Sequence, residues 1–116
     1  MRDPVRRGFY LVTIGHCMEC HSPRRDGHSD LKNALGKGGE KFVGPWGVSV
    51  SRNITSHPVA GLGGWSDAQI KRAITQGVSR DGRKLLPPMG FAWYARMIAP
   101  DLDAIVAYLR TVPPLE

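Results

Sequence analysis

The sequence has little of three features, and each shortage excludes a class of protein. It has only two cysteines in 116 residues, which excludes a framework of several disulfides and a four-cysteine zinc site. Its apolar stretch FYLVTIG is far too short to span a membrane, so no transmembrane segment is predicted. No run of like charge exceeds two adjacent residues, and no basic segment is interleaved with aromatic side chains, so nucleic acid is not expected as a partner.

The overall composition indicates a basic, loop-rich domain spanning residues 1–116. Lys and Arg number 16 against 10 Asp and Glu, and the net charge of +6 predicts steering toward a partner with an acidic docking surface. The 14 glycines and 9 prolines are a high share, and so short a chain is easier to stabilise around a large apolar cofactor than alone. No small-x-small cleavage site follows the first apolar stretch, so we expect a mature protein or an excised domain.

Hydrophobic periodicity and end signals predict four helices. The first spans about 4–14 after the cap Asp3, the second lies between Ser66 and Gly77, a short one is expected in FAWYARM, and the last spans 100–112. Residues 22–64 lack such periodicity, and only VSVS suggests an extended segment. An irregular segment of this length is unusual unless it wraps a functional group. An all-α fold of about four helices and long loops is therefore predicted.

Both cysteines lie in the stretch GHCMECHSP, residues 15–23. Cys17 and Cys20 are three residues apart, so on a helical turn their thiols leave the same face, and His21 can point toward the same space. C-x-x-C followed directly by His is the pattern of covalent haem c attachment. The two thiols would form thioether bonds to the vinyl groups while the imidazole binds iron. We therefore interpret these three residues as one half of a haem site.

Three other interpretations of the cysteine pair are weaker. A structural zinc site needs four ligands, and no second Cys/His pair follows at a suitable spacing. A thioredoxin-like pair needs a βαβ context, whereas strand patterns are almost absent. A disulfide across two intervening residues closes too small a loop to stabilise the chain much. A non-haem metal-binding module stays as the alternative to haem.

The sixth ligand of a haem iron decides its chemistry, because a thioether suits electron transfer and an open site suits gas binding or peroxide chemistry. Met89 is the predicted ligand: it lies in LLPPMGF, where Pro87 and Pro88 stiffen the loop and Gly90 lets the backbone approach the ring. His57, which precedes a proline in a loop, is the competing ligand.

The remaining methionines and histidines have simpler interpretations. Met18 lies inside the attachment motif, and Met97 has helical spacing from Trp93, which is typical of a core residue. His16 and His28 are expected at the surface or beside the haem propionates. The carbonyl of Pro23 is predicted to accept a hydrogen bond from the second ring nitrogen of His21 and so orient the ring, although a proline there can equally be only a helix stop.

With these residues placed, the chain resembles a class I c-type cytochrome over nearly its whole length. The segments HCMECHSP, NIT, GLGGWSDAQIKRAITQGVSRDGRKLLPPM and DLDAIVAYLRTVPP look more narrowly like one haem domain of the cytochrome c subunits of bacterial alcohol, aldehyde and sugar-acid dehydrogenases. The resemblance implies a cytochrome c fold in which the N- and C-terminal helices cross. The residues expected at that crossing are Gly8 and Phe9 against Leu102, Ile105 and Tyr108.

The resemblance also implies a set of cofactor-binding residues. His21 and Met89 would be the axial iron ligands of one covalent haem c held by Cys17 and Cys20. The positions that match the propionate side are Arg52, Asn53 and Trp65, with Trp46 along the same edge.

The implied function is electron transfer through a single haem. Similar dehydrogenase subunits carry three attachment motifs and this chain has one, so we expect an excised domain or a single-haem relative. The implied partners are a dehydrogenase or other donor and an oxidase or other cytochrome acceptor, in the periplasm or at the periplasmic face of the inner membrane. No paired acid and base groups suggest substrate chemistry, so an electron carrier or an electron-transfer module of an oxidoreductase complex is expected rather than an enzyme. The alternative is a haem sensor or peroxidase-like protein with a displaceable sixth ligand.

Overall fold

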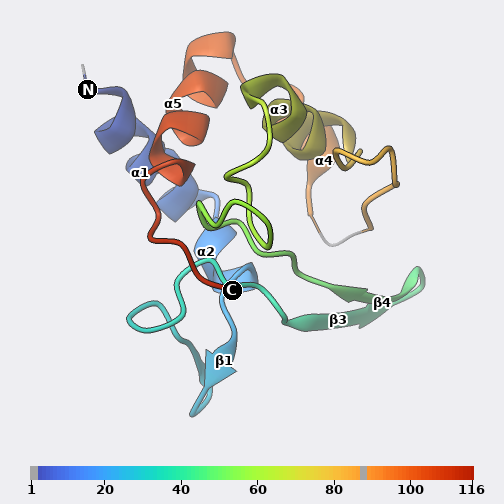
Figure 1. Cartoon of the computed structure of the whole chain (residues 1–116). Helices are drawn as coiled ribbons and strands as arrows, with labels where there is room; N and C mark the ends of the chain where they lie inside the picture. The colour runs from blue at the N-terminus through green and yellow to red at the C-terminus, as the bar shows by residue number, and fades with distance from the viewer. Residues whose placement is uncertain (1–2, 87–88) are drawn as a thin grey trace.

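The chain runs through two helices, two small hairpins and three further helices (Figure 1). The computed structural model describes residues 3–86 and 89–116. In this part of the chain the elements are α1 (Pro4–Ile14), α2 (Cys17–Cys20), β1 (Arg24–Arg25), β2 (His28–Ser29), β3 (Lys41–Gly44), β4 (Gly47–Val50), α3 (Asp67–Gln76), α4 (Phe91–Tyr94) and α5 (Ala99–Leu109). The expected all-α fold therefore holds only loosely. The described residues form five helices instead of four, because the attachment motif makes a helix of its own, and two antiparallel two-stranded ribbons accompany them.

The first and last long helices pack against each other, as predicted (Figure 1). Gly8 allows this contact, because a Cβ there would overlap the carbonyl group of Ala104 and lie 2.7 Å from the Cβ of Tyr108. Beside it, the rings of Phe9 and Tyr108 meet edge to face with centroids 5.5 Å apart. The two helices can approach this closely only because one of them has no side chain at the contact.

Helix α3 begins and ends where its local sequence requires. The hydroxyl of Ser66 accepts the amide of Gln69 at 3.1 Å, and the side chain of Gln69 accepts the amide of Ser66 at 2.9 Å, which completes a capping box. Gly77 ends the helix with a φ of +67°, in the left-handed region that glycine adopts without strain. The predicted second helix is confirmed.

The apolar core lies between α1, α3, α5 and the chain beyond α5. Val12, Ile70 and Val112 are almost fully buried, at 1%, 2% and 2% exposure. Ile70 and the neighbouring Ile105 belong to this core and also line the cavity described below, so the core and the site share a wall. None of the helices in the described residues is both long enough and apolar enough to cross a membrane.

Candidate functional site

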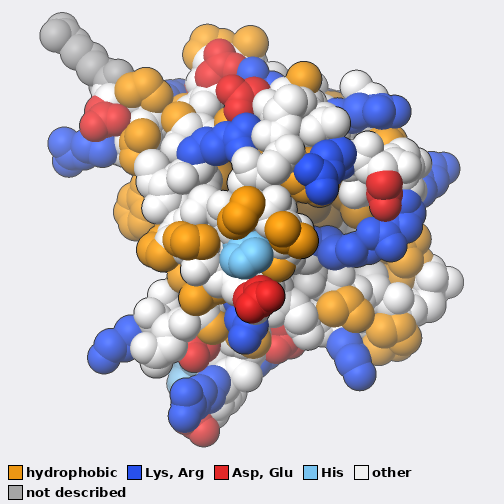
Figure 2. Space-filling view, in the orientation of Figure 1, with side chains coloured by type: hydrophobic (Ala, Val, Ile, Leu, Met, Phe, Trp, Pro, Cys, Tyr) orange, Lys and Arg blue, Asp and Glu red, His pale blue; other side chains and the backbone are white. Residues whose placement is uncertain are grey.

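A large cavity opens between α1 and α2 on one side and the segment from α3 to α4 on the other. Its volume is about 1130 Å³, and most side chains on its walls are apolar. On the face drawn in Figure 2 the surface is hollowed beside a group of Lys and Arg side chains. A cavity of this size and lining suits a large, mostly apolar group.

Helix α2 presents both cysteines to the cavity. Cys17 and Cys20 are its first and last residues, and both have free thiols and line the cavity. His16 lies just before α2 with a φ of +56°, so the chain changes direction between α1 and α2. The same-face placement expected from the C-x-x-C spacing is therefore present.

The imidazole of His21 lines the same cavity, and its hydrogen bond defines its tautomer. Nδ1 lies 2.7 Å from the carbonyl oxygen of Arg52. A carbonyl can only accept, so Nδ1 carries the proton and donates it, and Nε2 keeps a free lone pair. Burial lowers the pKa of His21, so the ring is neutral at neutral pH. A neutral imidazole with a free Nε2 is the form that binds a metal ion.

Pro23 does not have the role predicted for it. Its carbonyl accepts the amide of Asp30 at 2.8 Å, while the backbone carbonyl of Arg52 accepts the hydrogen bond from Nδ1 of His21. The reason is the turn at Gly38, which has a φ of +78° and donates its amide to the His21 carbonyl at 2.6 Å. A Cβ on Gly38 would lie 2.5 Å from the carbonyl carbon of Arg52, so only glycine lets the Arg52 backbone come this close to His21.

The environment of the two thiols argues against disulfide-exchange chemistry. Burial raises the pKa of Cys17 to about 11, and burial also raises the pKa of Cys20. A redox-active thiol pair needs the opposite shift, because the thiolate is the attacking form. Nor do residues 3–86 and 89–116 contain a group of three or more His, Cys, Asp or Glu placed to hold a metal ion. The raised pKa values weaken the thiol-redox interpretation.

The wall opposite α2 comes from the chain around α4. Met89, Phe91, Tyr94 and Met97 all line the cavity, and Met97 also packs against the core. Met89 is half-buried, and its carbonyl accepts the amide of Phe91 at 3.0 Å. The stiffening expected of the preceding prolines falls on residues 87–88, which lie outside the described residues. Among the residues that the structure describes, two methionines therefore line the cavity, where the sequence predicted one.

Tyr94 is a site residue that the sequence reasoning missed. It lines the cavity, and burial together with the nearby thiols of Cys17 and Cys20 raises the pKa of its hydroxyl. Its ring also approaches the Met89–Gly90 turn, since a Cβ on Gly90 would lie 4.0 Å from Cζ of Tyr94. The available signal was the spacing of Phe91 and Tyr94, which are three residues apart on a short helix directly after Met89.

Three residues predicted for the propionate side do line the cavity: Arg52, Asn53 and Trp65. The amide group of Asn53 is engaged with the protein itself, because Nδ2 donates to the carbonyl of Leu115 at 2.6 Å and Oδ1 accepts the hydroxyl of Thr55 at 2.7 Å. Asn53 therefore ties the C-terminal segment to the wall. The Arg52 side chain is exposed, and none of its guanidinium donors has a partner among the described residues, so it can offer them to a carboxylate.

Trp46 does not line the cavity, contrary to expectation. The tight turn between β3 and β4 folds the indole back onto Gly44, where a Cβ would meet ring atoms of Trp46. The indole Nε1 is buried and has no hydrogen-bond partner among the described residues.

His57 is also absent from the cavity walls, which argues against it as the competing ligand. Its Nδ1 accepts the amides of Val59 at 3.1 Å and Ala60 at 2.9 Å. This ring nitrogen is thus engaged in hydrogen bonds within the loop that contains His57. His28 is exposed in β2, and His16 is exposed at the cavity edge, in agreement with the surface positions expected for both.

Comparison with known proteins identifies the family. The sequence model described as Cytochrome c matches residues 5–113, which is nearly the whole chain. The chain belongs to the cytochrome c family.

Several curated relatives of this cytochrome c are subunits of dehydrogenases. A nicotinate dehydrogenase subunit of Pseudomonas putida is 34% identical over 96% of this chain. The fructose dehydrogenase cytochrome subunit of Gluconobacter japonicus is 32% identical over 99%, and the gluconate 2-dehydrogenase cytochrome c subunit of Pantoea cypripedii is 34% identical over 90%. The chain spans only 9%, 23% and 22% of the length of these three proteins.

The side chains of this cytochrome c fit a haem c group. Cys17 and Cys20 offer two free thiols from one helical face, and His21 offers an unprotonated Nε2 beside them. Thioethers stand on the opposite wall, and apolar side chains enclose the space between. Each donor that covalent attachment and axial ligation require is therefore present on the wall of one cavity.

Proposed function

We propose that this cytochrome c domain transfers electrons through one covalently bound haem c. Cys17 and Cys20 would hold the group by thioether bonds, and His21 Nε2 and the Met89 sulfur would bind its iron. The observation that carries the proposal is that both thiols, the free imidazole nitrogen and Met89 line one cavity of about 1130 Å³. The bound iron would supply a one-electron couple, and a thioether ligand would raise its reduction potential.

The other residues of the site would position and shield the group. The Arg52 carbonyl keeps the proton on Nδ1 of His21 and so holds the imidazole in the liganding tautomer. Apolar walls exclude water, which favours the less charged reduced iron. The Arg52 side chain at the edge of the cavity would face the propionates, with Trp65 on the same wall. The site would thus provide ligation and a dry environment, with no substrate chemistry of its own.

The partner would be a dehydrogenase or another redox protein that reaches the cavity mouth. Relatives in this family are named as cytochrome subunits of fructose, gluconate and quinone-dependent alcohol dehydrogenases. Arg80, Arg83 and Lys84 are exposed where they line the cavity, so a partner with an acidic docking surface would be favoured. By analogy with such subunits, the domain would work in the periplasm or at the periplasmic face of the inner membrane.

The test compares two methionine variants of the haem-loaded chain. Met89→Ala should abolish the far-red charge-transfer band of the ferric protein, because this band reports a methionine sulfur on iron. Met97→Ala should retain the band and only lower stability, because Met97 also packs against the core.

Three other results of this test would each lead to a different conclusion. Loss of the band in Met97→Ala alone would make Met97 the ligand. A wild-type protein without the band would favour a sensor or peroxidase-like function with an open site. Absence of covalently bound haem from a denaturing gel would overturn the haem proposal itself.

A further inference from the structure

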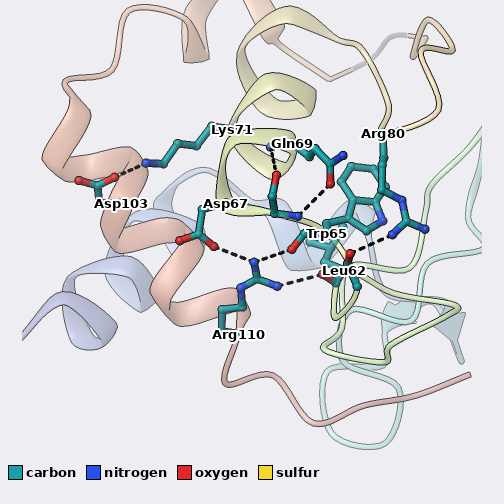
Figure 3. A network of polar contacts seen from close by, with 10 residues as sticks. Leu62, Trp65, Asp67, Gln69, Lys71, Arg80, Asp103 and Arg110 are labelled. Carbon is teal, nitrogen blue, oxygen red and sulfur yellow. Dashed lines mark hydrogen bonds and ion pairs between the residues drawn. The ribbon is translucent and has the colours of Figure 1, made fainter.

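One arginine connects the last helix to the wall of the cavity. Arg110 caps the C-terminus of α5, and its guanidinium reaches the turn that leads into α3 (Figure 3). Nη1 donates to the carbonyl of Leu62 at 3.0 Å, and Nη2 donates to the carbonyl of Trp65 at 2.7 Å. Nη2 also lies 2.7 Å from a carboxylate oxygen of Asp67, the first residue of α3. One side chain therefore binds the turn at three points.

The same turn forms part of the cavity wall. Leu62 and Trp65 both line the cavity, and Leu62 is buried in the core while Trp65 packs against it. The two carbonyls that Arg110 binds belong to these two residues. The guanidinium of arginine is planar and donates in fixed directions, so its charge-assisted hydrogen bonds define both the direction and the distance of each acceptor. The position of the Trp65 backbone thus depends on a contact with α5.

A second arginine, Arg80, contacts the indole of Trp65. The guanidinium of Arg80 lies over the ring, 5.5 Å from its centroid, and Nη1 donates to the carbonyl of Gly64 at 3.0 Å (Figure 3). The backbone of Trp65 is therefore held by Arg110 and its ring by Arg80. Arg80 is exposed, whereas the two carbonyl contacts of Arg110 are partly buried, so Arg110 supplies the firmer of the two attachments.

From this arrangement we propose that Arg110 is a positioning residue of the redox site. Its forked hydrogen bonds keep Trp65 on the cavity wall and exclude water from that side of the bound group. The inference rests on the proposed function, because the group that Trp65 shields is the haem. When the guanidinium hydrogen bonds of Arg110 are lost, water can enter beside Trp65. The reduction potential then falls, because water stabilises the more highly charged oxidised iron.

A nearby ion pair provides a matched control. Lys71 of α3 binds Asp103 of α5, so this pair connects the same two helices (Figure 3). Neither residue lines the cavity. A purely structural link between α3 and α5 is therefore already present in the chain, and its loss should lower stability without changing the potential.

The experiment is a redox titration of the haem-loaded full chain and its variants. Arg110→Gln and Arg110→Lys should both have a lower reduction potential than the wild type while the methionine charge-transfer band remains. Lysine keeps the charge and the stem but cannot form the fork, so it should restore only part of the potential. Lys71→Gln should leave the potential unchanged. In a Trp65→Leu background, Arg110→Lys should cause no further shift, because the residue through which it acts is gone.

Three outcomes would overturn the inference. One is an Arg110→Gln protein with the wild-type potential. Another is complete restoration by Arg110→Lys, which would assign the effect to charge alone. The third is an equal fall in Lys71→Gln. If Arg110→Gln does not fold, the conservative Arg110→Lys variant decides by the same criteria. A wild-type chain that holds no covalent haem would instead overturn the proposed function.

Discussion

The contact between α1 and α5 depends on Gly8, and replacing this residue with alanine tests that dependence. The added Cβ would overlap the backbone carbonyl of Ala104 and lie 2.7 Å from Cβ of Tyr108. The obstacle is backbone, so no change of side-chain rotamer can remove it. The two helices would have to move apart at their main contact, beside the buried Val12 and Ile105.

Two opposing effects determine the size of the change. Alanine is a better helix former than glycine by about 1 kcal/mol, which favours the variant. Overpacking in a tight contact costs about 1–3 kcal/mol, and an unyielding backbone neighbour places Gly8→Ala at the upper end of this range. The net loss in the free energy of unfolding should therefore be about 1–2 kcal/mol. For a domain of this size that corresponds to a melting temperature lower by about 4–8 °C.

Thermal unfolding of the haem-loaded chain, followed by circular dichroism of the helices, measures this loss. Arg6→Ala serves as the control, because Arg6 is exposed on the same helix and its loss should change stability by no more than about 0.5 kcal/mol. An unchanged or higher melting temperature for Gly8→Ala would refute the reasoning. It would mean that helix propensity outweighs the close approach of the two helices.

Two smaller predictions concern the cap of α3 and the thiols. Ser66→Ala should lower the free energy of unfolding by about 1 kcal/mol in chemical denaturation, because it removes half of the capping box. Ser66→Thr keeps a hydroxyl and should retain most of this stability. Equal losses in the two variants would contradict the role of the cap. In the folded chain without haem, the rate of alkylation of Cys17 should keep rising above pH 9, toward the pKa of about 11. The reason is that burial favours the protonated thiol, whereas only the thiolate reacts. A plateau of the rate near pH 9 would show that the thiol is not buried. The sign of the accompanying change in stability follows from the raised pKa: the folded state retains the proton longer than the unfolded chain, so stability is lost as the pH rises from about 9 to 11.

The helices and the attachment motif could be predicted because their signals are local. Helix α1 follows from Asp3 and Pro4, and α3 follows from Ser66 with Gln69, all within one or two turns of the residues they order. The thiols of α2 share a face because of their spacing alone. The extended segment expected at VSVS forms most of β4. Its pairing with β3 and the hairpin of β1 and β2 were not predicted, because strands of two to four residues are too short for a pattern of alternation.

The errors at the site have a different cause, since each involves residues far apart in the chain or a turn that redirects a side chain. Pro23 is adjacent to the motif and was a reasonable acceptor for His21, but Gly38 brings in Arg52 instead. Trp46 folds back onto Gly44 and leaves the cavity wall. These outcomes depend on how loops pack, which no local propensity encodes.

By itself the sequence determined the chemistry available to this protein: two thiols and an imidazole on one helical turn, one candidate methionine in the loop before FAWYARM, and the long helices that frame them. Only the tertiary structure decided how those groups are held. In the folded chain the Arg52 carbonyl, 31 residues away, is the hydrogen-bond partner of His21. Folding also brings Tyr94 to the cavity and lets Arg110 bind the carbonyl of Trp65 on the cavity wall. The physical reason is that covalent spacing and capping act within a few residues, whereas a hydrogen bond between distant segments exists only once the whole chain has packed.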